Sequence, residues 1–159
     1  MSAESVVRTV EVAVDPATAF DVFTRDIGSW YQPGPYSWND PERAVGIRFE
    51  PGVGGRLLEL YDEEARDAYE MGRILVWDPG DRLVFEFHSL HFPPEPLTEV
   101  EVRFEAVNGR TRVTLEHRGL DRLPPAFVER IRDRAWVAFM RWFSDYANER
   151  SAPGATASS

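Results

Sequence analysis

A series of short β-rich runs between residues 45 and 117, separated by turn-forming residues, constrains the fold more than any other feature of this sequence. Residues 98–107 and 110–117 flank an Asn-Gly pair, which strongly favours a two-residue hairpin turn. Asp-Pro-Gly-Asp and a glycine-rich run separate two earlier pairs of β-rich runs, 69–77 with 82–88 and 45–50 with 56–61. Connections this short cannot form a parallel crossover, so these six strands are predicted to pair antiparallel.

One more strand and two short helices are predicted before these runs. Within residues 6–14, Val10, Val12 and Val14 alternate with Thr9, Glu11 and Ala13, which is typical of a strand with one buried face. The Asp-Pro pair at positions 15 and 16 suits the N-cap and first position of a helix, expected over residues 16–25. A second short helix, of one or two turns, is expected over residues 26–31.

The last predicted element is a helix from about Pro124 to Asn148. Its apolar residues cover more than half of the helix circumference, interrupted mainly by Arg132. So broad a stripe indicates burial from two sides. A sheet that curls around such a helix leaves space between the two layers, and pockets form there. We therefore expect an α+β fold in which a curved seven-stranded antiparallel sheet surrounds a long C-terminal helix.

Length and composition favour one domain. The 159 residues, 43% of them hydrophobic, suffice for a single core, expected over residues 1–150, with residues 151–159 as a disordered tail. A net charge of −9 disfavours nucleic acid as a partner, and no apolar run is long enough for membrane insertion. The absence of cysteine is typical of a reducing compartment, and no leader segment is evident, so we expect a cytoplasmic location.

Several short motifs follow one another in a specific order along residues 6–146. They are Val12-Ala13-Val14-Asp15-Pro16 with Ala19-Phe20-Asp21-Val22-Phe23, Trp30, Gly54-Gly55-Arg56, Gly72 with Ile74-Leu75-Val76 and Asp78-Pro79, Arg82-Leu83-Val84-Phe85, and Thr114-Leu115-Glu116-His117-Arg118-Gly119. Their order resembles the SRPBCC or START-like superfamily, with the helix-grip fold of the birch-pollen allergen. Within it, the chain is similar to homologues of the activator of the heat-shock-protein-90 ATPase. The resemblance implies a cavity scaffold that serves several functions, so it predicts the fold and not the function.

Three functions from different classes remain open. The first is binding of a small hydrophobic ligand, such as a lipid, a polyketide or an aromatic metabolite, in the cavity between sheet and helix. The second is a cofactor-independent cyclase, dehydratase or hydrolase that uses the same cavity. The third is an interaction protein like a chaperone ATPase activator, against which we weigh that a single small acidic domain is expected, without an additional chaperone-binding region. A homodimer is compatible with all three, and we expect the exposed aromatic residues Tyr31, Tyr36 and Trp38 at its interface.

His117 is the titratable residue that we expect inside the cavity. It shares a strand face with Val113 and Leu115, so its side chain should point toward the long helix. One interpretation is functional: His117 is a polar anchor for a ligand, or the general base of an enzyme with a Tyr or Glu as its partner. The other is structural: it is a core histidine hydrogen-bonded to the backbone or to a residue of the helix. Seven aromatic residues are candidates to line the cavity, although most of them are expected simply to belong to the core. They are Trp77, Phe85, Phe87, Phe104, Trp136, Phe139 and Phe143.

No metal site and no cofactor are expected. His88 and His91 lie at a strand end and in a proline-rich loop, without an obvious third ligand. Glu59 and Glu86 lie within strands, and we interpret both as solvated carboxylates on the outer face of the sheet.

Two proline-rich loops lie where a cavity mouth is expected. Residues 31–41 are rich in proline and aromatic residues, and residues 90–97 contain three prolines before the sixth strand. Either loop could fold over the mouth as a lid. Either is equally well explained as a surface connection that proline makes rigid.

Overall fold

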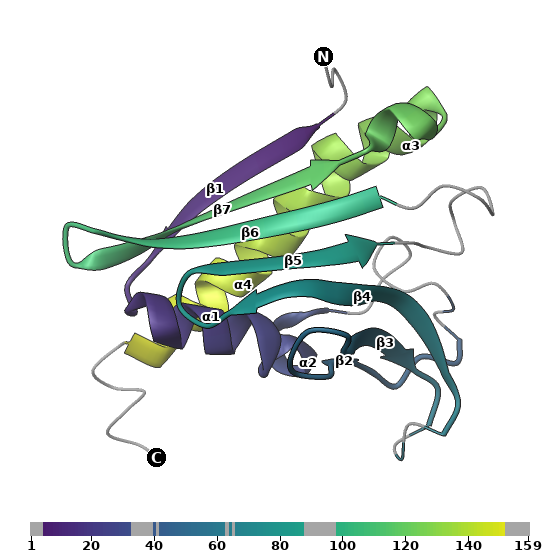
Figure 1. Ribbon diagram of the computed structural model, residues 1–159, viewed down its shortest axis with the longest axis horizontal. Helices are drawn as coiled ribbons and strands as arrows, with labels where there is room; N and C mark the ends of the chain where they lie inside the picture. The colour runs from purple at the N-terminus through teal and green to yellow at the C-terminus, as the bar shows by residue number, and fades with distance from the viewer. Residues whose placement is uncertain are drawn as a thin grey trace.

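In the computed structural model, seven antiparallel strands form one sheet that curves around a long helix (Figure 1). The structure describes residues 5–32, 40, 42–62, 64, 66–87 and 98–151. The strand order is β1-β7-β6-β5-β4-β3-β2, so each strand from β2 onward pairs with the next, and β1 lies beside β7. The strands are β1 Val6–Val12, β2 Gly46–Phe49, β3 Arg56–Leu60, β4 Ala68–Asp78, β5 Arg82–Phe87, β6 Thr98–Val107 and β7 Arg110–Arg118. The predicted fold class is confirmed.

Two short helices follow β1, and a longer helical segment ends the described chain. The helices are α1 Pro16–Thr24, α2 Ile27–Trp30, α3 Pro125–Arg130 and α4 Trp136–Ser151. A 3-10 turn, Leu120–Arg122, precedes α3, and a π-helical turn, Ile131–Ala135, joins α3 to α4. Within the described residues, no helix is both long and apolar enough to cross a membrane.

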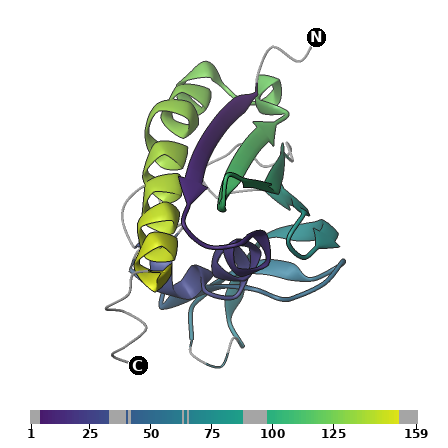
Figure 2. The same cartoon turned by 90° about the vertical axis from the view of Figure 1, so that its left-hand side faces the viewer.

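The long helix lies behind the sheet in Figure 1 and along one side of the molecule in Figure 2. The prediction was right about the extent of this segment and wrong about its regularity, because the π-helical turn interrupts it. Such a turn adds a residue to one helical turn and so changes the direction of the side chains on either side of it. At the other end of α4, the Asn148 side-chain carbonyl accepts a hydrogen bond of 2.9 Å from the backbone N–H of Ala13. The helix is thus fastened to the end of β1.

Helices α1 and α2 cover one end of the concave face (Figure 2). Ala19, Phe20 and Phe23 of α1 are all buried. The indole N–H of Trp30 donates a hydrogen bond of 2.8 Å to the carbonyl of Val22. This bond holds α2 against α1 and turns the aromatic end of α2 toward the sheet.

Strand β4 is irregular in both of its pairings. Its register shifts beside Leu57 of β3, and again beside Ile74 where it pairs with β5. A Cβ atom on Gly72 would lie 1.6 Å from the carbonyl oxygen of Glu86, so the neighbouring backbone occupies the space that a side chain would need. Because β-bulges bend a sheet and increase its twist, β4 helps to give the sheet its concave face.

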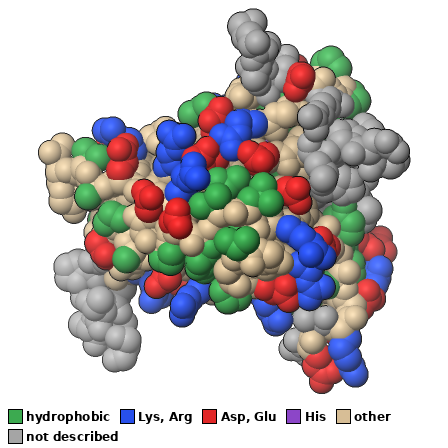
Figure 3. Space-filling view, in the orientation of Figure 1, with side chains coloured by type: hydrophobic (Ala, Val, Ile, Leu, Met, Phe, Trp, Pro, Cys, Tyr) green, Lys and Arg blue, Asp and Glu red, His purple; other side chains and the backbone are tan. Residues whose placement is uncertain are grey.

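The outer face of the sheet carries an ion-pair network centred on Glu101. The carboxylate accepts hydrogen bonds from Arg118 at 2.6 Å and Arg103 at 2.9 Å, and Arg82 lies at 3.4 Å. Burial raises the pKa of Glu101, but the hydrogen bonds from Arg118 and Arg103 outweigh it and lower the pKa to about 2. Acidic and basic side chains are intermixed over this face in Figure 3.

Candidate functional site

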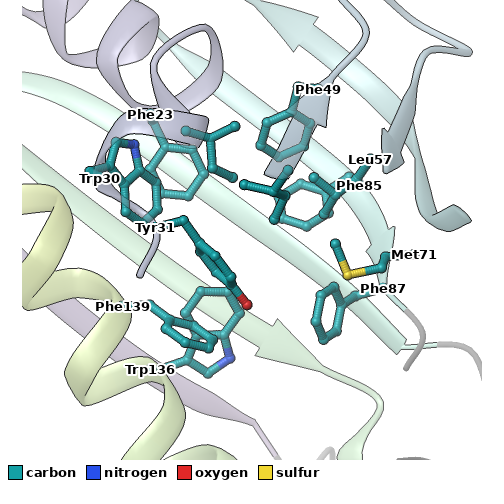
Figure 4. Close-up of a pocket in the computed structure, with 12 residues that line it drawn as sticks. Phe23, Trp30, Tyr31, Phe49, Leu57, Met71, Phe85, Phe87, Trp136 and Phe139 are labelled. Carbon is teal, nitrogen blue, oxygen red and sulfur yellow. The ribbon is translucent and has the colours of Figure 1, made fainter. Parts of the chain in front are cut away.

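An apolar pocket lies between the concave face of the sheet and the helices (Figure 4). Strands β2 to β5 contribute one side, and α1, α2 and the first turn of α4 contribute the other. Eight of the twelve lining residues are aromatic. The lining residues are Phe23, Ile27, Trp30, Tyr31, Ile47, Phe49, Leu57, Met71, Phe85, Phe87, Trp136 and Phe139.

The pocket is narrow in this structure. The space between its side chains amounts to about 370 Å³ when the part open to solvent is included, and about 30 Å³ of it admits the centre of a water-sized molecule. By this measure a water molecule needs roughly 10–15 Å³, so the pocket has room for about two. Pockets for small organic ligands commonly measure roughly 300–1,000 Å³. A guest of that size therefore requires side chains or loops to move.

Tyr31 occupies much of the space. Figure 4 shows its ring reaching across the pocket between Trp30 and the pair formed by Trp136 and Phe139. Its ring centroid lies 5.0 Å from that of Phe139 and 6.0 Å from that of Trp142. The prediction that Tyr31 is exposed is wrong, because the extended backbone after α2 turns the ring inward against the core. Its place at a dimer interface stays a prediction. The other two aromatic residues of that prediction, Tyr36 and Trp38, lie outside the described residues.

His117 points toward the helix, and both of its ring nitrogens are hydrogen-bonded. The indole N–H of Trp136 donates to Nδ1 at 2.9 Å, so the ring proton is on Nε2. Nε2 lies 2.7 Å from the hydroxyl of Thr98, and that hydroxyl donates to the carbonyl of Phe87 at 2.7 Å. Burial lowers the pKa of His117 to about 3. The residue is thus a neutral core histidine bonded to the helix, behind Trp136 and Phe87.

Half of the residues predicted to bind a ligand line the pocket: Phe85, Phe87, Trp136 and Phe139. The others lie behind it. Phe143 packs at 5.3 Å from Phe23, and Trp77 and Phe104 pack at 5.0 and 5.3 Å from Phe20. Phe104, Phe143 and His117 belong to the buried core, Trp77 is partly buried against it, and none of the four lines the pocket. Contact of any of the eight with a ligand stays a prediction.

The sequence analysis missed the lining residues from the first half of the chain. Ile47 and Phe49 alternate along β2, and this alternation was a usable signal for their face. Trp30 and Tyr31 were harder to predict, because a four-residue helix is too short for a periodic pattern. The curvature of the sheet brings these elements over the same space as β5.

Glu59 requires a correction. Predicted as a solvated carboxylate on the outer face, it is fully buried on the concave side. It pairs with Ile47 of β2 and shares its face of β3 with Leu57, and both of these residues line the pocket. Its Oε2 atom accepts hydrogen bonds from the backbone N–H of Asp40 at 2.9 Å and from the hydroxyl of Tyr61 at 2.8 Å.

Three phenol groups experience the charge of Glu59. Burial, and then the charge of Glu59, raise the pKa of Tyr31 and of Tyr69. The pKa of Tyr61 is raised by burial and by its hydrogen bond to Glu59. All three phenols therefore stay protonated at neutral pH. A carboxylate and tyrosine hydroxyls thus lie next to the apolar pocket, beside Ile47 and Leu57, but Glu59 itself does not line it.

The other charged and polar residues considered from the sequence do not reach the pocket. Glu86 is half-buried and does not line the pocket. Among the described residues, no group of three or more histidine, aspartate and glutamate side chains could hold a metal ion. His88 and His91 lie outside that part of the chain, as do most residues of the two loops considered as lids.

Residues 13–143 match the profile of a family described as Activator of Hsp90 ATPase homolog 1-like protein. The fold is similar to that of CalC from Micromonospora echinospora, described as a self-sacrificing resistance protein, at 28% identity over 96% of this chain and 99% of that chain, with a TM-score of 0.67. It is also similar to the Aha1 dimer from Colwellia psychrerythraea (13% identity, 93% and 98% of the two chains, TM-score 0.64). Ara h 8.0201 is a third similar structure (12% identity, 90% and 96% of the two chains, TM-score 0.60). No curated protein matches the sequence.

Proposed function

The chain belongs to the Activator of Hsp90 ATPase homolog 1-like family, and from this premise we propose that it binds a small hydrophobic molecule in the pocket between sheet and helix. The observation that carries the proposal is the lining, in which every side chain is apolar or aromatic. The indole N–H groups of Trp30 and Trp136 are already bonded to Val22 and His117. The pocket therefore offers a guest mainly apolar surface.

The shape of the lining favours a rigid aromatic or polyketide guest over a lipid. Several neighbouring rings meet edge to face, as Trp136 and Phe139 do at 5.2 Å and 86°. An aromatic guest can extend such contacts, each of which adds about 0.5–1.5 kcal/mol beyond the burial of surface. A flexible acyl chain loses more conformational entropy when it is ordered in a narrow space.

Binding requires the pocket to open, and the Tyr31 side chain is the residue whose movement we propose. Its ring crosses the pocket and packs on Phe139, and it directly follows the last residue of α2. Rotation of the ring away from Phe139 would join the small internal space to the part that is open to solvent.

Binding of N-phenyl-1-naphthylamine, an uncharged aromatic probe whose fluorescence rises in apolar surroundings, tests the proposal. We expect saturable binding to the full chain at one site. Met71→Trp should abolish it, because Met71 is buried in the lining and a larger ring fills the remaining space. Leu75→Trp is the matched control on the same strand, since Leu75 is 41% exposed, and it should bind like the original chain.

Circular dichroism and thermal unfolding first confirm that both variants are folded. Binding that persists unchanged in Met71→Trp would place the probe elsewhere and refute this pocket. Absence of binding to the original chain and to the enlarged variant Phe87→Ala would refute the proposed function itself.

A protective role is a second candidate, which the similarity to a resistance protein favours. In that role the chain would sequester a toxic hydrophobic molecule in the same pocket. Bacteria expressing the original chain should then tolerate a higher dose of an aromatic antibiotic, in a panel of such compounds, than bacteria expressing Met71→Trp. Equal tolerance for every compound in the panel would remove this candidate.

A further inference from the structure

We infer that the preferred guest of this pocket carries a protonated amine on an aromatic body, and that Glu59 receives the amine. The inference rests on the proposed function, since it concerns the same pocket and adds the chemical class of the guest. It depends on one juxtaposition, a fully buried carboxylate on the concave side of the sheet whose neighbours Ile47 and Leu57 line the aromatic pocket.

The strand pairing places Glu59 beside the pocket, next to residues that line it, although its own side chain does not. Its partner across β2 is Ile47, and its neighbour on the same face of β3 is Leu57, and both line the pocket. Its partner on β4 is Tyr69, which packs against the core. Its charge also acts on Tyr31, whose ring crosses the space. A group that displaces the Tyr31 ring therefore enters the field of the carboxylate.

A carboxylate beside aromatic faces is the combination that recognises an ammonium group. The carboxylate supplies an opposite charge and hydrogen-bond acceptors, and charge-assisted hydrogen bonds are stronger than neutral ones. The faces of tyrosine, phenylalanine and tryptophan rings attract a cation through their quadrupoles. Both effects gain strength in a pocket from which water is largely excluded.

The same arrangement disfavours an anionic guest. A carboxylate or phosphate on the guest would meet the charge of Glu59 in surroundings that screen it poorly. The chain as a whole has a net charge of −9, so its long-range field attracts cations and repels anions. Fatty acids and aromatic acids are therefore expected to bind poorly, although their bodies suit the apolar lining.

Glu59 also has a structural role that the experiment must separate from recognition. Its Oε2 atom holds the backbone N–H of Asp40 and the hydroxyl of Tyr61. Arg43 lies over the Tyr61 ring at 4.3 Å from the centroid. A purely structural Glu59 would stabilise this corner of the fold without any preference for the charge of a guest.

Three probes with the same aromatic body separate the two roles: 1-naphthylmethylamine, 1-naphthalenemethanol and 1-naphthoic acid. Their dissociation constants for the full chain are measured by isothermal titration calorimetry at pH 7. We expect the amine to bind at least about tenfold more tightly than the alcohol, and the acid to bind more weakly than the alcohol. The affinity of Glu59→Gln for the amine should fall to its affinity for the alcohol. Its affinity for the alcohol should differ from that of the original chain by less than about twofold.

Glu86→Gln is the matched control, because it removes one negative charge from the same sheet at a residue between Phe85 and Phe87, on the face of β5 opposite these two lining residues. It should keep the preference for the amine. Tyr61→Phe is a second variant, which keeps the carboxylate and removes one of its hydrogen-bond donors, and it too should retain the preference. The ranking of the three probes in the original chain tests the inference even if Glu59→Gln fails to fold.

Equal affinity for amine and alcohol in the original chain, or a preference that survives in folded Glu59→Gln, would overturn the inference. Binding of the alcohol in either case would leave the proposed function standing. Failure of all three probes, together with failure of N-phenyl-1-naphthylamine to bind the original chain and Phe87→Ala, would overturn both.

Discussion

His117 joins the sheet to the long helix through both of its ring nitrogens. The indole N–H of Trp136 is buried, and a buried donor without a partner costs about 1–3 kcal/mol. Nδ1 of His117 provides its acceptor, and Nε2 continues the chain of hydrogen bonds to Thr98 and the carbonyl of Phe87. The histidine thereby fixes the ring of Trp136, which lines the pocket.

Replacement of His117 by glutamine should remove part of the pH dependence of stability. Burial lowers the pKa of the folded residue to about 3, against an ordinary value of 6.5. Between these values the unfolded chain binds a proton that the folded chain excludes, so the free energy of unfolding falls as the pH falls. From pH 7 to pH 5, the original chain should lose about 2 kcal/mol more than His117→Gln in urea denaturation. Equal losses would contradict the buried, neutral state of His117.

The sequence was sufficient to predict the direction of His117 but not that of Glu59. His117 alternates with Val113 and Leu115 on a strand with one clearly buried face. Around Glu59, both faces of β3 are covered, because Leu58 and Leu60 are buried as well. The charge of a residue then no longer indicates its face, and only the register of β3 against β2 and β4 places Glu59.

At the scale of elements, Glu101 connects three neighbouring strands. Arg82 comes from β5, Arg103 from β6 and Arg118 from β7, and all three meet the carboxylate of Glu101. The Glu101 side chain is 5% exposed, whereas that of Glu99, which also pairs with Arg118, is 41% exposed. Removal of a buried partner leaves a charged group without compensation, but removal of an exposed one has little effect.

Glu101→Ala should therefore destabilise the fold by about 3 kcal/mol, and Glu99→Ala by less than about 1 kcal/mol. Because the pKa of Glu101 is lowered from 4.5 to about 2, its contribution is complete above pH 4.5 and is lost as the pH falls toward 2. Urea denaturation at pH 7 and pH 3 measures both effects. If the two variants were equally stable at pH 7, the network would not depend on the buried carboxylate.

Substitution of two glycines by alanine separates two causes of lost stability: steric conflict at Gly72 and an unfavourable backbone conformation at Gly109. Gly109 has a φ of +77° in the β6–β7 hairpin, and a Cβ there would contact nothing within 4 Å, so Gly109→Ala should cost about 1–2 kcal/mol. Gly72→Ala should cost more, about 3 kcal/mol or above, because the Cβ would meet the β5 backbone. Thermal unfolding of both variants checks the order. A larger loss for Gly109→Ala would mean that β4 and β5 separate easily.

Elements defined by local chemistry were predictable, and those that depend on tertiary packing were not. The Asn108-Gly109 turn has positive φ at both residues, as its sequence predicts. The Asp15-Pro16 helix start is also confirmed. The π-helical turn has no such local signal. It lies between α3 and the start of α4, where Trp136 bonds to His117. The need to direct Trp136 toward His117 arises only when the helix packs against the sheet.

At the scale of the whole molecule, stability and ligand binding compete for the same interior space. The rings that line the pocket pack closely and leave about 30 Å³, and that packing stabilises the chain without a guest. A binding-competent state must separate some of these rings. The apparent affinity is then lowered by the fraction of molecules that are open.

Phe87→Ala should therefore be less stable than the original chain but bind more tightly. Phe87 lines the pocket and is partly exposed, so its removal should cost about 2 kcal/mol of stability, below the usual range for a fully buried ring. The space it leaves lets a guest enter without further opening, which removes part of the cost of the conformational change. In thermal unfolding with N-phenyl-1-naphthylamine, the variant should begin at a lower Tm and show a larger rise at each probe concentration than the original chain. A smaller rise in the variant would show that the Phe87 ring itself holds the guest, and that the closed pocket is already the binding state.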